Sequence, residues 1–232
     1  MKKLLFFAAA FGLLVFTLWP QVESLGDKGA RRFAALKRPA KEIVVGVCWP
    51  FSVNQDGMAD GLQLALDEIN SRKLAGGYTI RLVMRDDAFD GEKAKRIAMD
   101  FADTPDMSAV IGYYDDELAV KASPIFESSL LLHLIVGANN TDMTAHGFQY
   151  IVRTTLTSKK IARKVAQLAV SRGHRKIAVI WEEDAYGEDL AHQLRVGLDN
   201  LNAQVVYQWS YSRDSADFRL PVNELKGVGA DL

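Results

Sequence analysis

Short apolar runs alternate along the chain with stretches in which apolar residues have helical spacing. Runs typical of buried strands cover 43–49, 79–84, 109–113, 130–136, 150–153, 176–181 and 205–209. Between them, apolar residues recur three or four positions apart within 58–69, 94–101, 118–126, 161–169 and 190–201, which is the spacing of one helix face. The pattern also predicts that another strand begins within 224–232.

This alternation predicts an α/β fold. Continuous apolar strands are buried on both faces, so we expect doubly wound parallel sheets with helices on both sides. Sheets of this kind bind ligands outside the carboxyl ends of their strands. The loops at those ends are 49–54, 113–117, 137–141 and 181–187. These four loops are where we expect a binding site.

The N-terminal segment has the form of an export signal. Two lysines precede 16 residues without a charge, 4–19, which is shorter than a membrane-spanning helix requires. Small residues at Ser24 and Gly26 mark a cleavage site before Asp27, and an uncleaved anchor is the alternative. We expect 1–26 to be a signal peptide or N-terminal anchor, and the charged segment 27–41 to be a solvated basic linker.

Composition excludes several classes of function. The net charge is −1, so no overall basic surface points to nucleic acid. The four histidines are scattered, and neither a CxxC nor an HExxH spacing occurs, so we expect no metal site and no cofactor. His133 and the single cysteine, Cys48, both lie in apolar strands, where we expect them to be core residues.

The first two loops offer aromatic and acidic side chains. The first lacks the glycines of a phosphate-binding loop. Trp49 and Ser52 suit a small ligand that rests on a ring, although the tryptophan could equally be a core residue under the loop. The second contains Tyr113, Asp115 and Asp116 at the start of a helix. Acids at this position cap helices, and one that faced a ligand would favour a cationic group; acid–base catalysis lacks a nucleophile or metal ligand.

The other two loops offer backbone groups, an amide and a phenol. Gly137 and Ala138 allow a ligand to approach the backbone, and Asn139 can both donate and accept hydrogen bonds. A turn that satisfies its own backbone is the alternative. Tyr186 precedes a helix, where it either faces a ligand or packs against the helix start.

Five ordered segments resemble a known family. They are "IVVGVCWPFS…GLQLALDEINSR", "IRLVMRDDAFDGEKAKRIAMDF", "AVIGYYDDELAVKASPIFE", "GFQYIVRTT" and "KIAVIWEEDAYGEDLAHQLRVGLDNLNAQV". In this order they resemble the type I periplasmic binding proteins of branched-chain amino acid transporters. The resemblance implies two α/β lobes that hold a solute between them for delivery to an ABC transporter permease.

The resemblance also implies lobe boundaries and site positions. The first lobe would be 42–153 and a partial second lobe 154–232, because the resemblance stops at Leu232 before a typical member ends. Either a truncated reading frame or a covering partner chain would explain that end. Asp116 stands where the family has a ligand-binding serine, and Asn139 where threonine is common. The second-lobe tyrosine of the family falls on Tyr186.

We therefore expect an exported, periplasmic solute-binding protein that captures a small amino-acid-like or amide solute, and not an enzyme. A membrane-anchored sensory domain is the main alternative, motivated by the basic residues behind the apolar N-terminal run. An enzyme acting on nucleosides or sugars with the same fold is a third hypothesis, and it lacks a convergent catalytic set.

Overall fold

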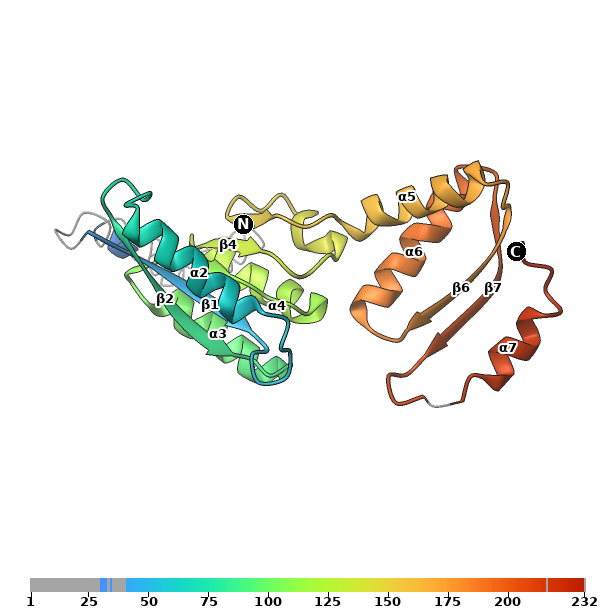
Figure 1. The fold of residues 1–232 in the computed structure, drawn as a ribbon, viewed down its shortest axis with the longest axis horizontal. Helices are drawn as coiled ribbons and strands as arrows, with labels where there is room; N and C mark the ends of the chain where they lie inside the picture. The colour runs from blue at the N-terminus through green and yellow to red at the C-terminus, as the bar shows by residue number, and fades with distance from the viewer. Residues whose placement is uncertain (1–29, 33, 35–40, 216, 232) are drawn as a thin grey trace, which may run out of the picture. The chain divides into compact units, whose positions relative to one another are not determined.

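The computed structural model describes residues 30–32, 34, 41–215 and 217–231 (Figure 1). The expected signal peptide or anchor, 1–26, lies outside the described residues. Within them, no helix is long and apolar enough to cross a bilayer. The chain divides into two compact units. Unit 1 extends to Gly112 and includes Lys121–Leu134 and Gln149–Val152; unit 2 comprises Tyr113–Val120, Ile135–Phe148 and the chain from Arg153.

A five-stranded sheet organises the first part of the fold. Its strands are β1 (Glu42–Trp49), β2 (Thr79–Asp86), β3 (Met107–Ile111), β4 (Leu132–Ile135) and β5 (Ile151–Arg153), in the order β2-β1-β3-β4-β5. β1 pairs in parallel with β2 on one side and with β3 on the other, and β3 pairs in parallel with β4. The expected parallel, doubly wound α/β fold is confirmed.

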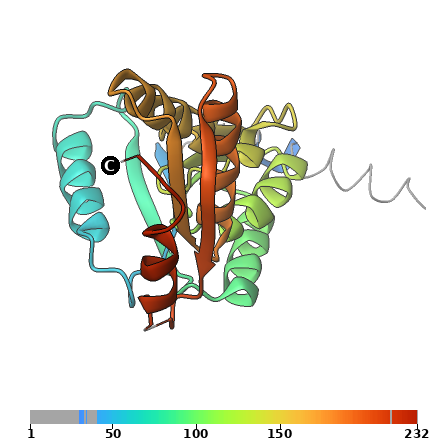
Figure 2. The same cartoon turned by 90° about the vertical axis from the view of Figure 1, so that its right-hand side faces the viewer.

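Helices cover both faces of this sheet. They are α2 (Met58–Ser71), α3 (Gly91–Asp103) and α4 (Asp116–Ser128), and a short 3-10 helix, η1 (Thr141–Thr144), follows β4. Figures 1 and 2 show α2 on one face and α3 and α4 on the other. β1 is buried from Val44 to Trp49, because it has a strand on each side and helices above and below.

Close approach of the backbone fixes the end of β3. Gly112 has φ 141°, and a Cβ there would lie 2.3 Å from the carbonyl oxygen of Cys48. Only glycine fits this position without strain. Cys48 and His133 are fully buried, as expected, and the His133 Nε2 lies 2.7 Å from the Gly112 carbonyl oxygen.

Unit 2 contains a second, two-stranded sheet. Its elements are α5 (Ser158–Ser171), β6 (Lys176–Glu182), α6 (Ala185–Asp199), β7 (Gln204–Tyr211) and α7 (Arg219–Leu225). β6 and β7 are parallel, and Figure 2 shows them side by side with α7 toward the viewer. α5 and α6 lie on the opposite face, where Ala166, Leu198 and Ala203 form a small core.

We expected a strand to begin within 224–232, and for the described residues this prediction is wrong. Glu224 and Leu225 end α7, and 226–229 form turns. Tertiary contacts hold this helix: the Tyr207 hydroxyl donates to Glu224 at 2.7 Å, and Phe218 packs edge-on against Trp209 and Tyr211. Beyond the turns, the Asp231 N–H donates to the Lys176 carbonyl at the start of β6.

Arg32 departs from the solvated linker that we expected at 27–41. It is 8% exposed and lies in a helical stretch, 30–32. Its guanidinium donates to the carbonyl oxygens of Ala102, Thr104, Met107 and Ser129. Orphan carbonyls at helix ends attract cations. At Arg32, therefore, the segment is part of unit 1.

Candidate functional site

In unit 1, the first loop places Trp49 and Ser52 in different environments. Trp49 is 4% exposed, and its indole N–H donates to Asp56 at 3.2 Å. Ser52 is exposed and donates to Asp86 through its backbone N–H at 3.4 Å. For Trp49 this geometry favours the core interpretation over a ligand-facing ring.

The adjacent acids of the second loop have different partners. The carboxylate of Asp115 accepts the Leu118 N–H at 3.0 Å, the bond of an N-cap at the start of α4. Asp116 is 5% exposed, and its Oδ1 accepts the N–H of Asn139 at 2.5 Å. Tyr113 is fully buried. Through its bond with Asn139, Asp116 joins this helix start to the third loop.

Burial dominates the electrostatics of Asp116. Its pKa is raised, chiefly because burial penalises the carboxylate, with a smaller contribution from the charge of Asp115. The bonds from Asn139 and Asn140 and the charge of Arg153 act in the opposite direction. The other carboxylate oxygen, Oδ2, is buried and has no hydrogen-bond partner among the described residues.

The third loop is held by its own neighbours. The Ala138 carbonyl accepts the Thr155 hydroxyl at 2.8 Å, and the Asn139 carbonyl accepts both the N–H and the hydroxyl of Ser158. The Asn139 side-chain amide donates to the Gly137 carbonyl at 3.4 Å, its one hydrogen bond to the described residues. The backbone of this loop therefore serves the fold, and its asparagine side chain is the part left for a ligand.

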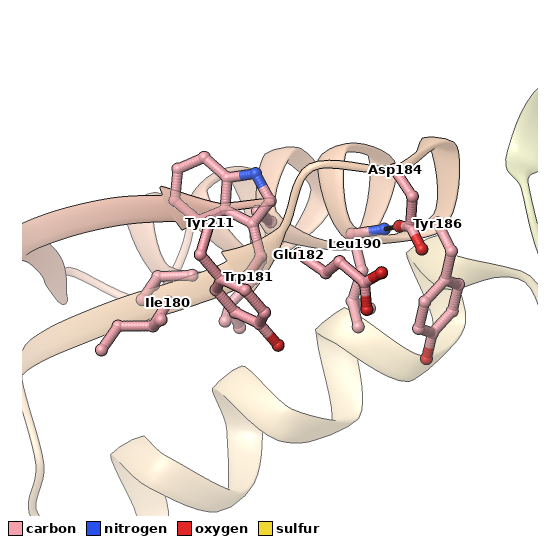
Figure 3. A pocket seen from close by; sticks show the side chains of 11 residues that line it. Ile180, Trp181, Glu182, Asp184, Tyr186, Leu190 and Tyr211 are labelled. Carbon is pink, nitrogen blue, oxygen red and sulfur yellow. Dashed lines mark hydrogen bonds between the residues drawn. The ribbon is translucent and has the colours of Figure 1, made fainter. Parts of the chain in front are cut away.

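Tyr186 lies in the first turn of α6, at the edge of a pocket in unit 2 (Figure 3). Asp184 caps that helix by accepting the Gly187 N–H at 2.7 Å. Tyr186 is 39% exposed, and its pKa is raised by partial burial and then by the charges of Asp116 and Asp184. The structure therefore brings Tyr186 within the electrostatic reach of Asp116.

The pocket beside Tyr186 has a volume of about 350 Å³. Trp181 and Tyr211 line it with aromatic surface, and Glu182 and Asp184 supply carboxylates. The Glu182 carboxylate accepts a hydrogen bond from the Arg213 Nε at 2.5 Å, so the guanidinium compensates part of the negative charge of Glu182. Aromatic walls with acidic groups suit a small organic ligand that carries a positive charge.

Three further polar residues belong to the surroundings of Asp116, and the sequence analysis did not single out their side chains. Arg153 ends β5 and donates through Nη2 to the Asn140 carbonyl at 2.6 Å and to the Thr144 hydroxyl at 3.2 Å. Asp189 of α6 accepts the Thr141 N–H at 3.0 Å. The strand-end rule applies to β5 as well, so Arg153 could have been found from its position. Thr141 ends the third candidate loop, although its side chain was not singled out there, and no sequence signal marked Asp189.

Metal ligands do not gather in the described part of the chain: it contains no group of three or more His, Cys, Asp or Glu residues placed to hold an ion. The candidate site thus consists of Asp116, Asn139, Thr141, Arg153 and Tyr186, with Asp189 beside them. All of them belong to unit 2.

Comparisons with known proteins give the context for this site. A family model described as periplasmic binding protein matches residues 43–232. The leucine-specific-binding protein of Salmonella typhimurium is 27% identical over 221 residues, covering 85% of this chain and 59% of that protein. The Leu/Ile/Val-binding protein homolog 7 of Brucella melitensis is 28% identical over 204 residues, covering 82% of this chain and 51% of that one.

A solved structure is similar as well. The ABC transporter substrate-binding protein of Desulfitobacterium hafniense, in complex with Leu, is 30% identical with a TM-score of 0.73. The match covers 82% of this chain and 57% of that one. The present chain therefore spans about half the length of the proteins that it matches.

Proposed function

Because this chain belongs to the periplasmic binding protein family, we propose that it captures a small amino-acid-like or amide solute and presents it to an ABC transporter permease. The family consists of solute-binding proteins, and we propose that this chain likewise binds without catalysis. The supporting observation is the unit 2 cluster around Asp116, whose buried Oδ2 has no hydrogen-bond partner among the described residues and whose charge acts on the Tyr186 phenol.

Localisation and lobe organisation belong to the same proposal. We propose an extracytoplasmic protein, with 42–153 as the first lobe and 154–232 as part of the second. The division into units supports a different assignment for Tyr113–Val120 and Ile135–Phe148, which it groups with the later chain. None of the relatives named above is described as a membrane receptor, so the sensory alternative rests on the N-terminal segment alone.

Calorimetry and thermal unfolding with a panel of solutes test the function. The panel contains leucine, isoleucine, valine, their amides and small amines. A solute at about 100 times its Kd stabilises the folded protein by about 2.7 kcal/mol, which raises Tm by roughly 5–10 °C for a chain of this size. We expect saturable heat and such a shift with at least one solute.

The test variant is Asn139→Ala, which removes a candidate ligand-binding side chain. The control is Gln63→Ala, on the exposed side of α2. We expect the first to weaken binding and the second to leave it unchanged. Absence of heat and of any Tm shift across the panel, on protein shown to be folded by circular dichroism, contradicts the proposal.

A further inference from the structure

Adjacent aspartates at the start of α4 are not equivalent. Asp115 is the N-cap of α4, because its carboxylate accepts the Leu118 N–H. The Oδ1 of Asp116 accepts the Asn139 N–H, while its Oδ2 has no hydrogen-bond partner in the described chain. A buried acceptor without a donor is costly, so this oxygen is suited to a donor supplied from outside.

Other buried polar atoms of the same cluster also lack partners within the described residues. They are the hydroxyl of Thr141 and the Nε and Nη1 of Arg153. These groups come from three separate elements: Asp116 from the start of α4, Thr141 from η1 and Arg153 from the end of β5. Native proteins satisfy most buried polar atoms, and unsatisfied ones concentrate where a ligand or water completes the network.

The charges of this cluster do not balance. Arg153 interacts electrostatically with both Asp116 and Asp189, and the charge of Asp115 also acts on Asp116, so the negative charges outnumber the positive one. In the part of the chain that the structure describes, no ion pair joins Arg153 to either carboxylate, and its Nη2 is committed to Asn140 and Thr144. Asp116 is buried, whereas Asp115 and Asp189 are half-buried. Excess negative charge at a buried carboxylate is unfavourable, so a positively charged ligand suits this cluster.

We propose that Asp116 is a specificity-determining residue that selects a small monocation, with an ammonium for its free oxygen and a neutral carbonyl acceptor for Arg153. This inference rests on the proposed function and names the substrate class of that site. Tyr186 adds an aromatic face for the cation. The unpartnered atoms are covered by protein, so binding involves a local rearrangement of unit 2.

An amino acid and its amide provide the test, because leucine and leucinamide differ only at the carboxylate. Both present an ammonium, but leucine has no net charge, whereas leucinamide carries one positive charge and a neutral carbonyl. Calorimetry of the full chain at neutral pH gives both Kd values. We expect the chain to bind leucinamide at least about tenfold more tightly than leucine, the range of one charge-assisted hydrogen bond.

Asp116→Asn keeps the shape of the side chain and the acceptor for Asn139, but removes the charge. We expect this variant to bind leucinamide at least about tenfold more weakly than the wild type, so that its Kd values for leucinamide and leucine become similar. Glu117→Gln is the matched control, because it removes one negative charge from the next residue, which is exposed. The control should keep the wild-type preference for leucinamide.

Each outcome bears on a separate claim. If the wild type binds solutes of the panel without preferring leucinamide, or if Asp116→Asn keeps the preference, Asp116 only holds the loop and the specificity inference is wrong. The proposed function then stands. If the folded wild type binds no solute of the panel, the proposed function fails, and this inference fails with it.

Discussion

The central strands of the two units differ in how they are enclosed. β1 in unit 1 has β2 on one side and β3 on the other, and it is buried from Val44 to Trp49. β6 in unit 2 has β7 on one side only within the described residues, and of its seven residues only Val179 is buried. Both strands lead directly into a candidate ligand loop.

This difference shows which part of the molecule can adjust. A strand with two neighbours and covered faces holds its backbone in place, so a clash there is transmitted to the whole sheet. A strand with a free edge can shift, and it also offers unpaired backbone groups to other strands. We therefore expect equal perturbations to cost more stability in unit 1 than in unit 2.

Two glycines with the same kind of contact test this expectation. A Cβ at Gly112 would lie 2.3 Å from the Cys48 carbonyl oxygen, and one at Gly187 would lie 2.2 Å from that of Glu182. Gly112→Ala adds strain because φ is 141°. We expect Gly112→Ala to lower the free energy of unfolding by roughly 4 kcal/mol or more, and Gly187→Ala by about half as much. Denaturant unfolding with hydrogen exchange at β1 and β6 measures both.

Gly61→Ala is the control for these substitutions. It lies in α2 with nothing within 4 Å of the added Cβ, so alanine should stabilise the helix by about 0.5–1 kcal/mol. If Gly112→Ala and Gly187→Ala lowered the free energy of unfolding equally, the expected difference between the units would be wrong. The second edge of β6, unpaired within the described residues, would then not let the strand shift to accommodate the added Cβ.

Acid should act mainly on unit 1. His133 is fully buried there, whereas the other three histidines, His146, His174 and His192, are exposed or half-buried and belong to unit 2. Burial lowers the pKa of His133 from 6.5 to about 4, and the bond with the Gly112 carbonyl opposes this only in part. Between these values the unfolded chain binds the proton and the folded chain does not, so stability falls as pH falls.

The full effect is worth about 3 kcal/mol, present above about pH 6.5 and lost by pH 4. We expect hydrogen exchange at β1 and β4 to accelerate across this range more than exchange at β6. His133→Gln retains a donor for the Gly112 carbonyl without titrating, so its stability should lack this slope. A slope that persists unchanged in His133→Gln would assign the acid sensitivity to other groups.

Local pattern was sufficient for the parts of the fold whose burial is uniform. The run 43–49 and the helical spacing of 94–101 predicted β1 and α3 within a few residues. The local sequence pattern could not predict α7. It is seven residues long with Pro221 near its start, and it depends on Phe218 and Glu224 meeting β7. Those contacts join positions that only the tertiary fold brings together.

The candidate site was less predictable for the same reason. Position at strand ends located Asp116, Asn139 and Tyr186, and the structure brings all three into unit 2. Sequence could not tell which of Asp115 and Asp116 caps α4, because one residue of helix register decides it. It also left the environment of Trp49 open, since a residue at a strand end can face either the core or the loop.

The smallest expected effect is on β6, whose second edge has no partner strand among the described residues. Ile180 on β6 is 41% exposed, whereas Val110 on β3 is fully buried between two neighbouring strands. Val110→Thr buries a hydroxyl and should cost about 1–3 kcal/mol, while Ile180→Thr should change the free energy of unfolding by no more than about 0.5 kcal/mol. Denaturant midpoints at constant slope measure both. A loss at Ile180 as large as that at Val110 would mean that β6 is covered in solution, which light scattering over a range of protein concentrations would trace to self-association through this edge.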